Sequence, residues 1–521
     1  MFSWPIIVAF LFELILTQLY IERVFNFLEN IYFSFILLLP VFIIETQTLK
    51  VFYLKTVYIF IVLMLFLETG YYYIFNSKFN PSSLFIVSET NLNEAKEFLL
   101  FYLNKKLLVF LFLLLVLLIH FFLNIKNFTN KIFSIQRKFF AIFLFLCLST
   151  LLILVSFSRR ENLPFVLAKS FYDLKKDSYF DDQKNYGDAF GPFTENLNSN
   201  LNDTYIIVIG ESISKRHLNI YGYERNTTPL LNKLQDEILI YDDVITPNAF
   251  TIEALGKALT SKKVDGSIVQ LLNKAGFKTF WLSNQNPIGI YESLISKIAK
   301  ASNTKHFLTT ARFDKNIIYD EELIVELEAA LKDNNDRKVI FIHLQGAHFD
   351  YKYRYPKKYN YFNDKPKSKY TINEETDHVI NTYDNAILYH DFIVSSIINK
   401  VKTKNISSAI LYFSDHGEEV FDTMEFSGHN DDIGSLPMFE IPFVLWRSES
   451  FQEKYNFEID LDRPYTTDDL FHSIADLCGI KNSSHVDFEK SIFNEDFKKR
   501  KRIILNNKDY DSILSIDKMM N

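Results

Sequence analysis

The strongest constraint on the fold is an uninterrupted apolar segment, Phe139–Ser158, which carries no charged side chain. A helix needs about 20 apolar residues to cross a bilayer, so this segment is long enough to span. Four other apolar stretches precede it in the chain, at residues 2–18, 31–45, 51–68 and 106–123. We therefore expect residues 1–158 to form a transmembrane domain of five helices.

Charged residues around these stretches predict how the domain lies in the membrane. The segment between the fourth and fifth stretches, Asn124–Lys138, has lysine and arginine but no acidic residue, which places it on the cytoplasmic side. Five spans then put the N-terminus inside and all residues after Ser158 outside. The first stretch contains Glu13 and no basic region precedes it, which argues against a cleaved signal peptide.

Two polar segments are predicted to lie on the outer side of the membrane. The first is the loop 69–105, in which Asn91 and Glu94 have the spacing of a helix-capping box. A second interpretation, compatible with the first, is a polar surface that contacts a lipid head group. The other segment, residues 159–203, mixes polar and aromatic residues, which predicts an amphipathic connector along the membrane surface followed by a linker.

Charge and cysteine usage narrow the class of protein. The formal net charge of −7 argues against nucleic acid as the main partner. The chain has 2 cysteines, Cys147 in the last apolar stretch and Cys478 near the C-terminus, so no internal disulfide framework is expected. A soluble domain outside the membrane must then be held together by its core.

Residues 204–521 are predicted to form an α/β domain, with a mostly parallel sheet between helices. Apolar runs typical of buried strands alternate with helical patterns, as in sheets covered on both faces. The strands are expected at Tyr205–Ile209, Lys278–Leu282, Val339–Leu344, Ile410–Phe413 and Ile441–Trp446. The helices are expected around residues 228–236, 251–260, 266–275, 320–332, 375–401 and 467–478.

Polar residues follow several of these strands, where ligands of α/β sheets bind. Glu211 follows the first strand, and Asp415 and His416 follow the fourth. Two carboxylates and one imidazole suit zinc and leave a fourth position open, as catalytic zinc sites do. Each residue alone is better explained as a solvated loop residue, but their coincidence at strand ends favours a metal site.

Thr251 is the candidate nucleophile beside this site. It lies where an irregular segment becomes a helix, and a helix N-terminus stabilises a phosphoryl group. A metal would lower the pKa of its hydroxyl. A second interpretation, compatible with the first, is that Thr251 is the helix N-cap.

Three further histidines were considered as ligands. His348 and His429 are interpreted as ligands of phosphate oxygens or of a second metal, whereas His343 is interpreted as a structural residue within a strand.

Taken together, these motifs resemble the alkaline phosphatase and sulfatase superfamily, and within it the membrane-bound phosphoethanolamine transferases of Gram-negative bacteria. The resemblance covers most of residues 204–446, and the five predicted spans and the loop around Glu89–Ala95 are also similar. The motifs that carry it are Ile209–Ser212, Leu218–Pro229, Val244–Thr251, Trp281–Gln285, His343–His348, Thr382–Ala386, Ser414–Glu418 and Gly428–Asn430.

The resemblance implies a full set of site residues and partners. Zinc would be held by Glu211, Asp415 and His416, with Thr251 as ligand and nucleophile; one ion would be firmly bound, and a second is left open. His348 and His429 would bind substrate phosphate or the second zinc. Thr90 and Glu94 would receive the ethanolamine end of phosphatidylethanolamine, the donor. The acceptor would be lipid A, lipopolysaccharide core or a surface glycan. The protein is expected to be a multi-pass, monomeric protein of the bacterial inner membrane with its catalytic domain in the periplasm.

Some features depart from the lipid A-modifying members. Those members have an asparagine where this chain has Ile86, and they carry disulfides that this chain cannot form. The endings of the motifs at Gln285 and Asn430 are closer to the branch that modifies core sugars or other envelope acceptors. The alternatives are another phospho-alcohol transferase, such as a glycerophosphate transferase, a phosphodiester or sulfate-ester hydrolase, or a membrane-anchored protein that only binds envelope lipid or glycan. A sulfatase would need Cys or Ser at the position of Thr251.

Overall fold

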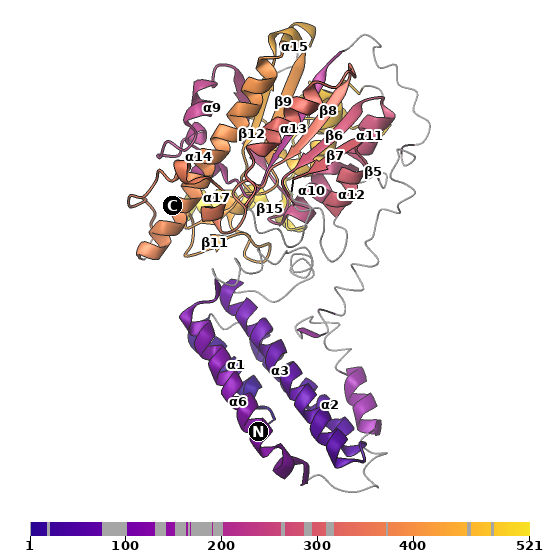
Figure 1. The fold of residues 1–521 in the computed structure, drawn as a ribbon, viewed down its shortest axis with the longest axis vertical. Coiled ribbons are helices and arrows are strands. Elements are labelled where there is room, and N and C mark those ends of the chain that lie inside the picture. Colours follow the sequence, from indigo (N-terminus) through magenta and orange to yellow (C-terminus); the bar gives the residue numbers. More distant parts are fainter. Residues whose placement is uncertain are drawn as a thin grey trace. The chain divides into compact units, whose positions relative to one another are not determined.

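The structure is a computed structural model (Figure 1). It describes residues 2–17, 21–75, 102–130, 142–151, 163–164, 167, 190, 202–261, 266–285, 294–308, 317–370, 373–455, 460–480 and 484–520. The described residues form two compact units, one within residues 1–178 and one within residues 179–521. The predicted connector 159–203, Thr90, Glu94 and Ile86 lie wholly or almost wholly outside the described residues.

The first unit is helical. Each of the five apolar stretches contains a helix, and three helices are long and apolar enough to cross a membrane: Arg23–Phe42, Gln47–Ile74 and Lys105–Lys126. Trp4–Leu16 and Ile142–Leu151 are shorter apolar helices, so the count of five spans stays a prediction. The four longest helical segments are α1 (Trp4–Leu16), α2 (Ile21–Leu38) continued by the 3-10 turn η1 (Leu39–Phe42), α3 (Gln47–Phe75) and α6 (Lys105–Asn130).

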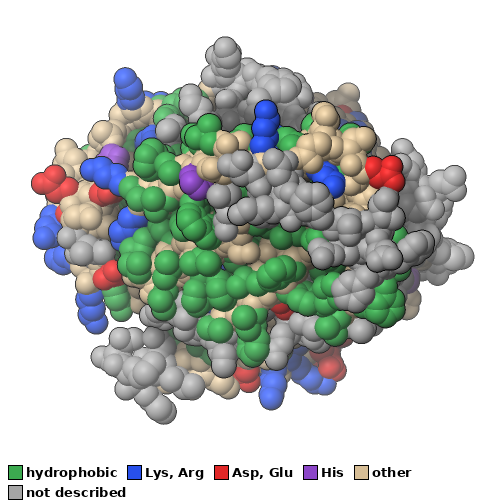
Figure 2. Space-filling model, turned by 90° about the horizontal axis from the view of Figure 1, so that it is seen from below, with side chains coloured by type: hydrophobic (Ala, Val, Ile, Leu, Met, Phe, Trp, Pro, Cys, Tyr) green, Lys and Arg blue, Asp and Glu red, His purple; other side chains and the backbone are tan. Residues whose placement is uncertain are grey.

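Hydrophobic side chains cover much of the surface of these helices. Phe52 is 68% exposed and Leu123 is 79% exposed, which is the arrangement expected where lipid replaces water. Green side chains accordingly form a broad area on the face drawn in Figure 2.

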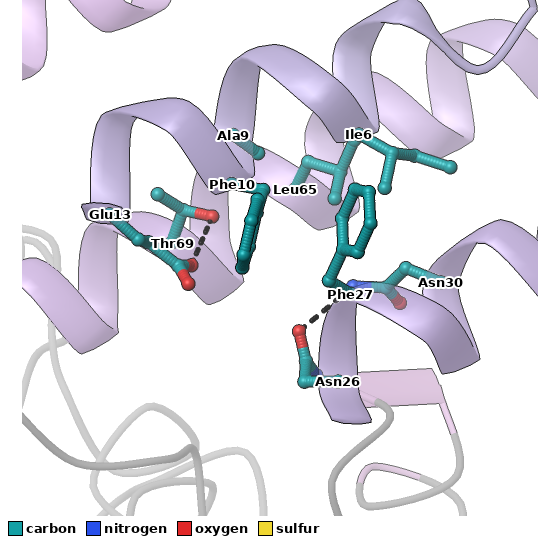
Figure 3. A pocket seen from close by; sticks show the side chains of 9 residues that line it. All are labelled: Ile6, Ala9, Phe10, Glu13, Asn26, Phe27, Asn30, Leu65 and Thr69. Carbon is teal, nitrogen blue, oxygen red and sulfur yellow. Dashed lines mark hydrogen bonds between the residues drawn. The ribbon is translucent and has the colours of Figure 1, made fainter. Parts of the chain in front are cut away.

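Some of the buried side chains of the first unit are polar and contact one another between helices. Glu13 of α1 accepts hydrogen bonds from Arg23 of α2, at 2.6 and 3.1 Å, and from Thr69 of α3, at 2.8 Å. The two oxygens of Glu68 accept from the amides of Asn26 (2.5 Å) and Asn30 (2.8 Å). Figure 3 shows several of these side chains around a small hollow between the helices. Every oxygen of both carboxylates is therefore hydrogen-bonded.

The second unit contains a seven-stranded sheet whose strand order is β2-β12-β9-β1-β8-β6-β7 (Figure 1). Six strands run in the same direction, and only β12 runs antiparallel to both of its neighbours, so the predicted mostly parallel sheet is confirmed. In chain order the strands are β1 (Thr204–Gly210), β2 (Ile238–Ile240), β6 (Lys278–Ser283), β7 (Thr304–Phe307), β8 (Lys338–His343), β9 (Ser408–Ser414) and β12 (Phe443–Arg447).

Helices cover both faces of this sheet because its strands are apolar on both sides. In β1, Ile207 and Ile209 pack into one hydrophobic core and Ile206 and Val208 into the other. The first core also takes side chains from α10 (Thr251–Leu259), α11 (Ile268–Lys274), α12 (Leu294–Lys300) and α16 (Leu470–Leu477). The second takes them from α9 (Pro229–Lys233), α13 (Glu322–Leu331) and α14 (Glu374–Lys402).

The predicted strands and helices of this unit are confirmed, with ends shifted by a few residues. The elements that were not predicted from the sequence include β2, β7, α12, α15 (Glu449–Lys454) and α17 (Tyr510–Met520). Cys147 and Cys478 are both free, as expected for a chain without a disulfide framework.

Candidate active site

The sheet brings Glu211 and Asp415 together. The central strand β1 pairs with β9 so that Gly210 lies opposite Ser414, and the backbone N–H of Asp415 donates to the carbonyl of Gly210 at 3.1 Å. Glu211 and Asp415 follow these paired residues at the same edge of the sheet, where parallel strands present their carboxyl ends.

Four predicted site residues converge within hydrogen-bonding range. Nε2 of His416 lies 3.5 Å from Glu211 and 3.4 Å from Asp415. The hydroxyl of Thr251 lies 3.3 Å from His416 Nε2 and 3.3 and 3.4 Å from the two oxygens of Glu211. Glu211, Asp415 and His416 are all buried.

These separations fit a tetrahedral zinc ion. Two ligands each about 2.0 Å from a tetrahedral centre lie about 3.3 Å apart, close to the spacing of the donors around His416. Oδ2 of Asp415 is buried and has no hydrogen-bond partner among the described residues, which is costly unless a cation faces it. The residues present therefore fit a divalent cation held by Glu211, Asp415 and His416.

Neighbouring groups orient the three ligands. Nδ1 of His416 lies 2.9 Å from the carbonyl of Gly417, to which it donates, so Nε2 carries the lone pair that faces the carboxylates. Oδ1 of Asp415 accepts from the backbone N–H groups of Ser212 (3.1 Å) and His416 (2.7 Å). Glu211 accepts from the side chain of Gln285 at 3.3 Å.

The electrostatics of the cluster favour a bound positive charge. Burial, together with the charge of Glu211, raises the pKa of Asp415 to about 6. Burial also raises the pKa of Glu211, but the hydrogen bond and charge of His416 outweigh it and hold that pKa below its usual value. Burial lowers the pKa of His416, yet the charge of Asp415 and the contact with Glu211 raise it to about 10. The two buried carboxylates therefore stabilise a positive charge placed beside them.

The backbone around the ligands is tightly packed. At Gly346 the φ angle is +53°, and an added Cβ would lie 2.6 Å from the carbonyl of Glu211. At Gly417 an added Cβ would lie 2.1 Å from the carbonyl of Pro437. Only glycine fits at these two positions, so the loop after β8 can pack against Glu211, and the loop after β9 can pack against Pro437 and Glu440.

Thr251 is the first residue of α10, and the cap position belongs to Phe250, which makes no side-chain cap hydrogen bond. The interpretation that Thr251 is the N-cap is therefore wrong. Its hydroxyl instead points to Glu211 and His416, because the helix begins beside the ends of β1 and β9.

His429 lies next to the cluster. Its ring centre is 4.2 Å from that of His416, and its Nδ1 lies 2.6 Å from the carboxylate of Glu418. Glu418 is fully buried and accepts a second hydrogen bond, of 2.6 Å, from the hydroxyl of Tyr351. His416, Glu418 and His429 form a second group whose donor atoms are close enough to hold a metal. The sequence analysis missed Glu418 as a site residue, although it directly follows Asp-His-Gly.

The other two histidines take different positions. His348 is half-buried in the loop after β8, and Asp320 fixes this loop by accepting from the backbone N–H groups of Gln345 and Gly346, both at 2.9 Å. His343 is the buried last residue of β8 and packs edge-on against Trp281 with ring centres 6.0 Å apart, as expected of a structural residue. Asp320 was also missed by the sequence analysis.

Comparisons with known proteins agree with this geometry. A family model described as Sulfatase matches residues 203–480. The phosphoethanolamine transferase CptA of Salmonella typhimurium strain LT2 is 30% identical over 481 residues, which cover 84% of this chain and 81% of CptA. The chain belongs to the phosphoethanolamine transferases of the sulfatase family.

Solved structures of phosphoethanolamine transferases share the fold. The C-terminal periplasmic domain of EptC from Escherichia coli, crystallised in complex with Zn, is 33% identical with a TM-score of 0.58 and covers 61% of this chain and 95% of that domain. The integral membrane phosphoethanolamine transferase EptA from Neisseria meningitidis is 20% identical with a TM-score of 0.60 and covers 89% of this chain and 91% of EptA. The second likeness extends the shared fold to the N-terminal unit.

Proposed function

We propose that this enzyme transfers phosphoethanolamine from phosphatidylethanolamine to an acceptor in the cell envelope, with Thr251 as the nucleophile. The observation that carries the proposal is the hydroxyl of Thr251 lying 3.3–3.4 Å from both Glu211 and His416, in a donor set that fits zinc. The family membership, the membrane-protein neighbour and the three apolar helices support an inner-membrane protein with a periplasmic catalytic domain. Five spans, a monomeric state and the domain limits 1–158, 159–203 and 204–521 belong to the same proposal.

The residues have distinct roles in this proposal. Glu211, Asp415 and His416 would hold zinc, which when bound lowers the pKa of the Thr251 hydroxyl and neutralises charge on the phosphoryl group. Glu418 holds the Nδ1 proton of His429, so Nε2 of that ring is left to face phosphoryl oxygens. His348 is proposed as the second contact to those oxygens, from the loop fixed by Asp320.

The reaction has two displacements. The Thr251 oxygen attacks phosphorus, the bond from phosphorus to the glycerol oxygen breaks, and diacylglycerol leaves with a proton. A hydroxyl or phosphate oxygen of the acceptor then attacks the phosphothreonine and releases Thr251 for another cycle. The N-terminus of α10 and the surrounding ligands stabilise the charge that develops in both steps.

The proposal is tested with Thr251→Ala and Thr251→Ser in the full-length protein. The alanine variant should lose transfer from phosphatidylethanolamine vesicles by at least about a thousandfold, because the attacking oxygen is gone. It should keep its fold and zinc, since three ligands remain. The serine variant should retain part of the activity. Intact-protein mass spectrometry should find the phosphoethanolamine adduct in the wild type and not in Thr251→Ala; turnover by the alanine variant would rule out Thr251 as the nucleophile.

A further inference from the structure

A second acidic residue, Asp431, contacts the segment that leads into Thr251. It follows β11 (Ser427–Gly428), two residues after His429. Its Oδ1 accepts from the backbone N–H of Ala249 at 2.6 Å, and its Oδ2 accepts from the side-chain amide of Asn248 at 2.7 Å. One carboxylate thus holds two consecutive residues just before the nucleophile.

The same segment is fixed from its other side. The carbonyl oxygen of the Asn248 side chain accepts from Lys257 of α10 at 2.7 Å, and Lys257 also donates to Asn506 at 2.6 Å. Asn506 belongs to the turn between β14 (Ile503–Ile504) and β15 (Lys508–Asp509), whose Leu505 N–H donates to the carbonyl of Pro247 at 2.9 Å. This hairpin lies beyond the residues that the family model matches.

Helix α10 depends on these contacts for its exact starting point. The cap residue Phe250 makes no side-chain cap hydrogen bond, so the local sequence does not fix the first turn. The reaction requires the Thr251 oxygen to stay within a few tenths of an ångström of its place, because a displacement of about 1 Å can cost about a hundredfold in rate. The ring of Phe250 also packs edge-on against His429, with ring centres 5.9 Å apart.

We propose that Asp431 is a positioning residue for the nucleophile: through Asn248 and Ala249 it fixes Thr251 against Glu211 and His416. Asp431 and His429 lie in the same short loop. Asp431 therefore also fixes the position of Thr251 relative to the imidazole of His429. Asp431 does not touch the substrate. This inference rests on the proposed function, since it assigns to Asp431 the placement of the attacking oxygen.

A reciprocal exchange tests the contact. In Asp431→Asn, two amide N–H groups face each other, and in Asn248→Asp, two carboxylates do. The double variant Asp431→Asn with Asn248→Asp restores one donor and one acceptor, keeps the net charge, and leaves an oxygen at residue 248 for Lys257. Asp432→Asn, the same chemical change at the exposed neighbouring residue, is the matched control.

The readouts separate positioning from folding. Full-length protein in nanodiscs containing phosphatidylethanolamine is followed by single-turnover formation of the Thr251 adduct, together with kcat, KM, zinc content and Tm. Each single variant should form the adduct about tenfold to a hundredfold more slowly, with KM changed less than about threefold and zinc content unchanged. The double variant should recover to within about threefold of the wild type, and Asp432→Asn should match the wild type.

The outcomes distinguish this inference from the function on which it rests. If the wild type forms no adduct on Thr251, the proposed function fails. If the wild type forms it and both single variants form it equally fast, Asp431 has no positioning role. Single variants that lose zinc and melt early, or a folded double variant that stays slow, would show a structural role only and overturn the inference. If a single variant does not fold, the recovery of adduct formation in the double variant decides.

Discussion

Both units of the molecule bury charged side chains, but the two sets differ in how completely their oxygens are hydrogen-bonded. In the membrane unit, each oxygen of Glu13 and Glu68 accepts a hydrogen bond from a side chain of a neighbouring helix. In the catalytic unit, Oδ2 of Asp415 is buried without a hydrogen bond from any described residue, although it lies 3.4 Å from Nε2 of His416. A buried network in which every polar atom is hydrogen-bonded holds helices together. A buried polar atom without a hydrogen bond instead indicates a site for a metal or another ligand.

The largest effect on activity is expected at the proposed metal site, where a carboxylate oxygen of Asp415 is buried without a hydrogen bond. Asp415→Ala and His416→Ala should each lower zinc content and reduce transfer by at least about a hundredfold, because each removes a metal ligand. Added zinc should raise the Tm of the wild type more than that of Asp415→Ala, because the variant lacks one of the proposed ligands. Elemental analysis, the transfer assay and Tm measure these effects. If both variants bind zinc as the wild type does, the site lies elsewhere.

The hydrogen-bonded network of Glu13 and Glu68 should instead affect stability and leave zinc content unchanged. Glu13→Ala leaves Arg23 buried without its carboxylate, which typically costs about 3–5 kcal/mol, so the protein should melt at a clearly lower temperature with unchanged zinc per folded chain. The double variant Glu13→Leu with Arg23→Met removes both charges and should recover most of that loss. Thermal unfolding in detergent measures both. A Glu13→Ala variant that melts like the wild type would remove the distinction between the two regions.

A smaller effect tests whether the loop 69–105 contributes to donor recognition. Glu94→Ala in the full-length protein should reduce transfer from phosphatidylethanolamine by about tenfold, and reduce hydrolysis of a small water-soluble phosphodiester less, because the carboxylate is proposed to bind the ammonium group. Equal loss of both activities would make Glu94 a helix cap only.

The soluble piece 204–521 should fold alone and hydrolyse the diester poorly, yet fail to modify the acceptor in cells.

A final test concerns a buried ion pair of the catalytic unit away from the metal ligands. His217 lies between Asp384 (2.7 Å) and Asp422 (3.3 Å). Burial lowers its pKa, but the charges of Asp422 and Asp384 outweigh this and raise it to about 10. A raised pKa in the folded state means that the stabilisation is complete below about pH 6.5 and is lost as the pH rises through about 10.

Stability of the piece 204–521 should therefore fall between these pH values by up to about 1.4 kcal/mol per pH unit. Urea unfolding at several pH values measures it, and His217→Gln is the control that should remove this component of the slope. An identical slope in both proteins would show that His217 is neutral when folded.

Much of the catalytic unit could be predicted from short apolar runs that end in polar residues. The rule for parallel sheets was enough to bring Glu211, Asp415 and His416 to one edge, because each follows a predicted strand. Thr251 was predicted separately, from its place at the start of a helix. Asp320 and Asp431 were not predicted, because they act on residues far away in the chain and no local pattern marks them, whereas Glu418 directly follows Asp-His-Gly and could have been found from that position. β2 and β7 were missed because they have only 3 and 4 residues, and those of β7 are mostly exposed.

In the membrane unit, the extent of one helix could not be predicted from the sequence. The sequence analysis placed the second apolar stretch at 31–45, whereas helix α2 begins at Ile21. Its first half contains Arg23, Asn26 and Asn30, which hide it from a search for apolar residues. These side chains are tolerated in the helix because Glu13 and Glu68 of neighbouring helices pair with them, and such pairing over more than one helix cannot be read from one stretch of sequence.

The central place of β1 has a consequence for how the chain folds. Thr204 pairs with Lys338 on one side and with Ser408 on the other, so both edges of β1 stay open until these distant segments have been made. Sheets built from such long-range pairs form slowly and expose strand edges that other chains can join. Glu211 meets Asp415 only when the last of these pairings is complete. Formation of the proposed metal site is thus a late event that requires both pairings of β1, and a chain that stalls before Ser408 lacks the proposed ligands Asp415 and His416.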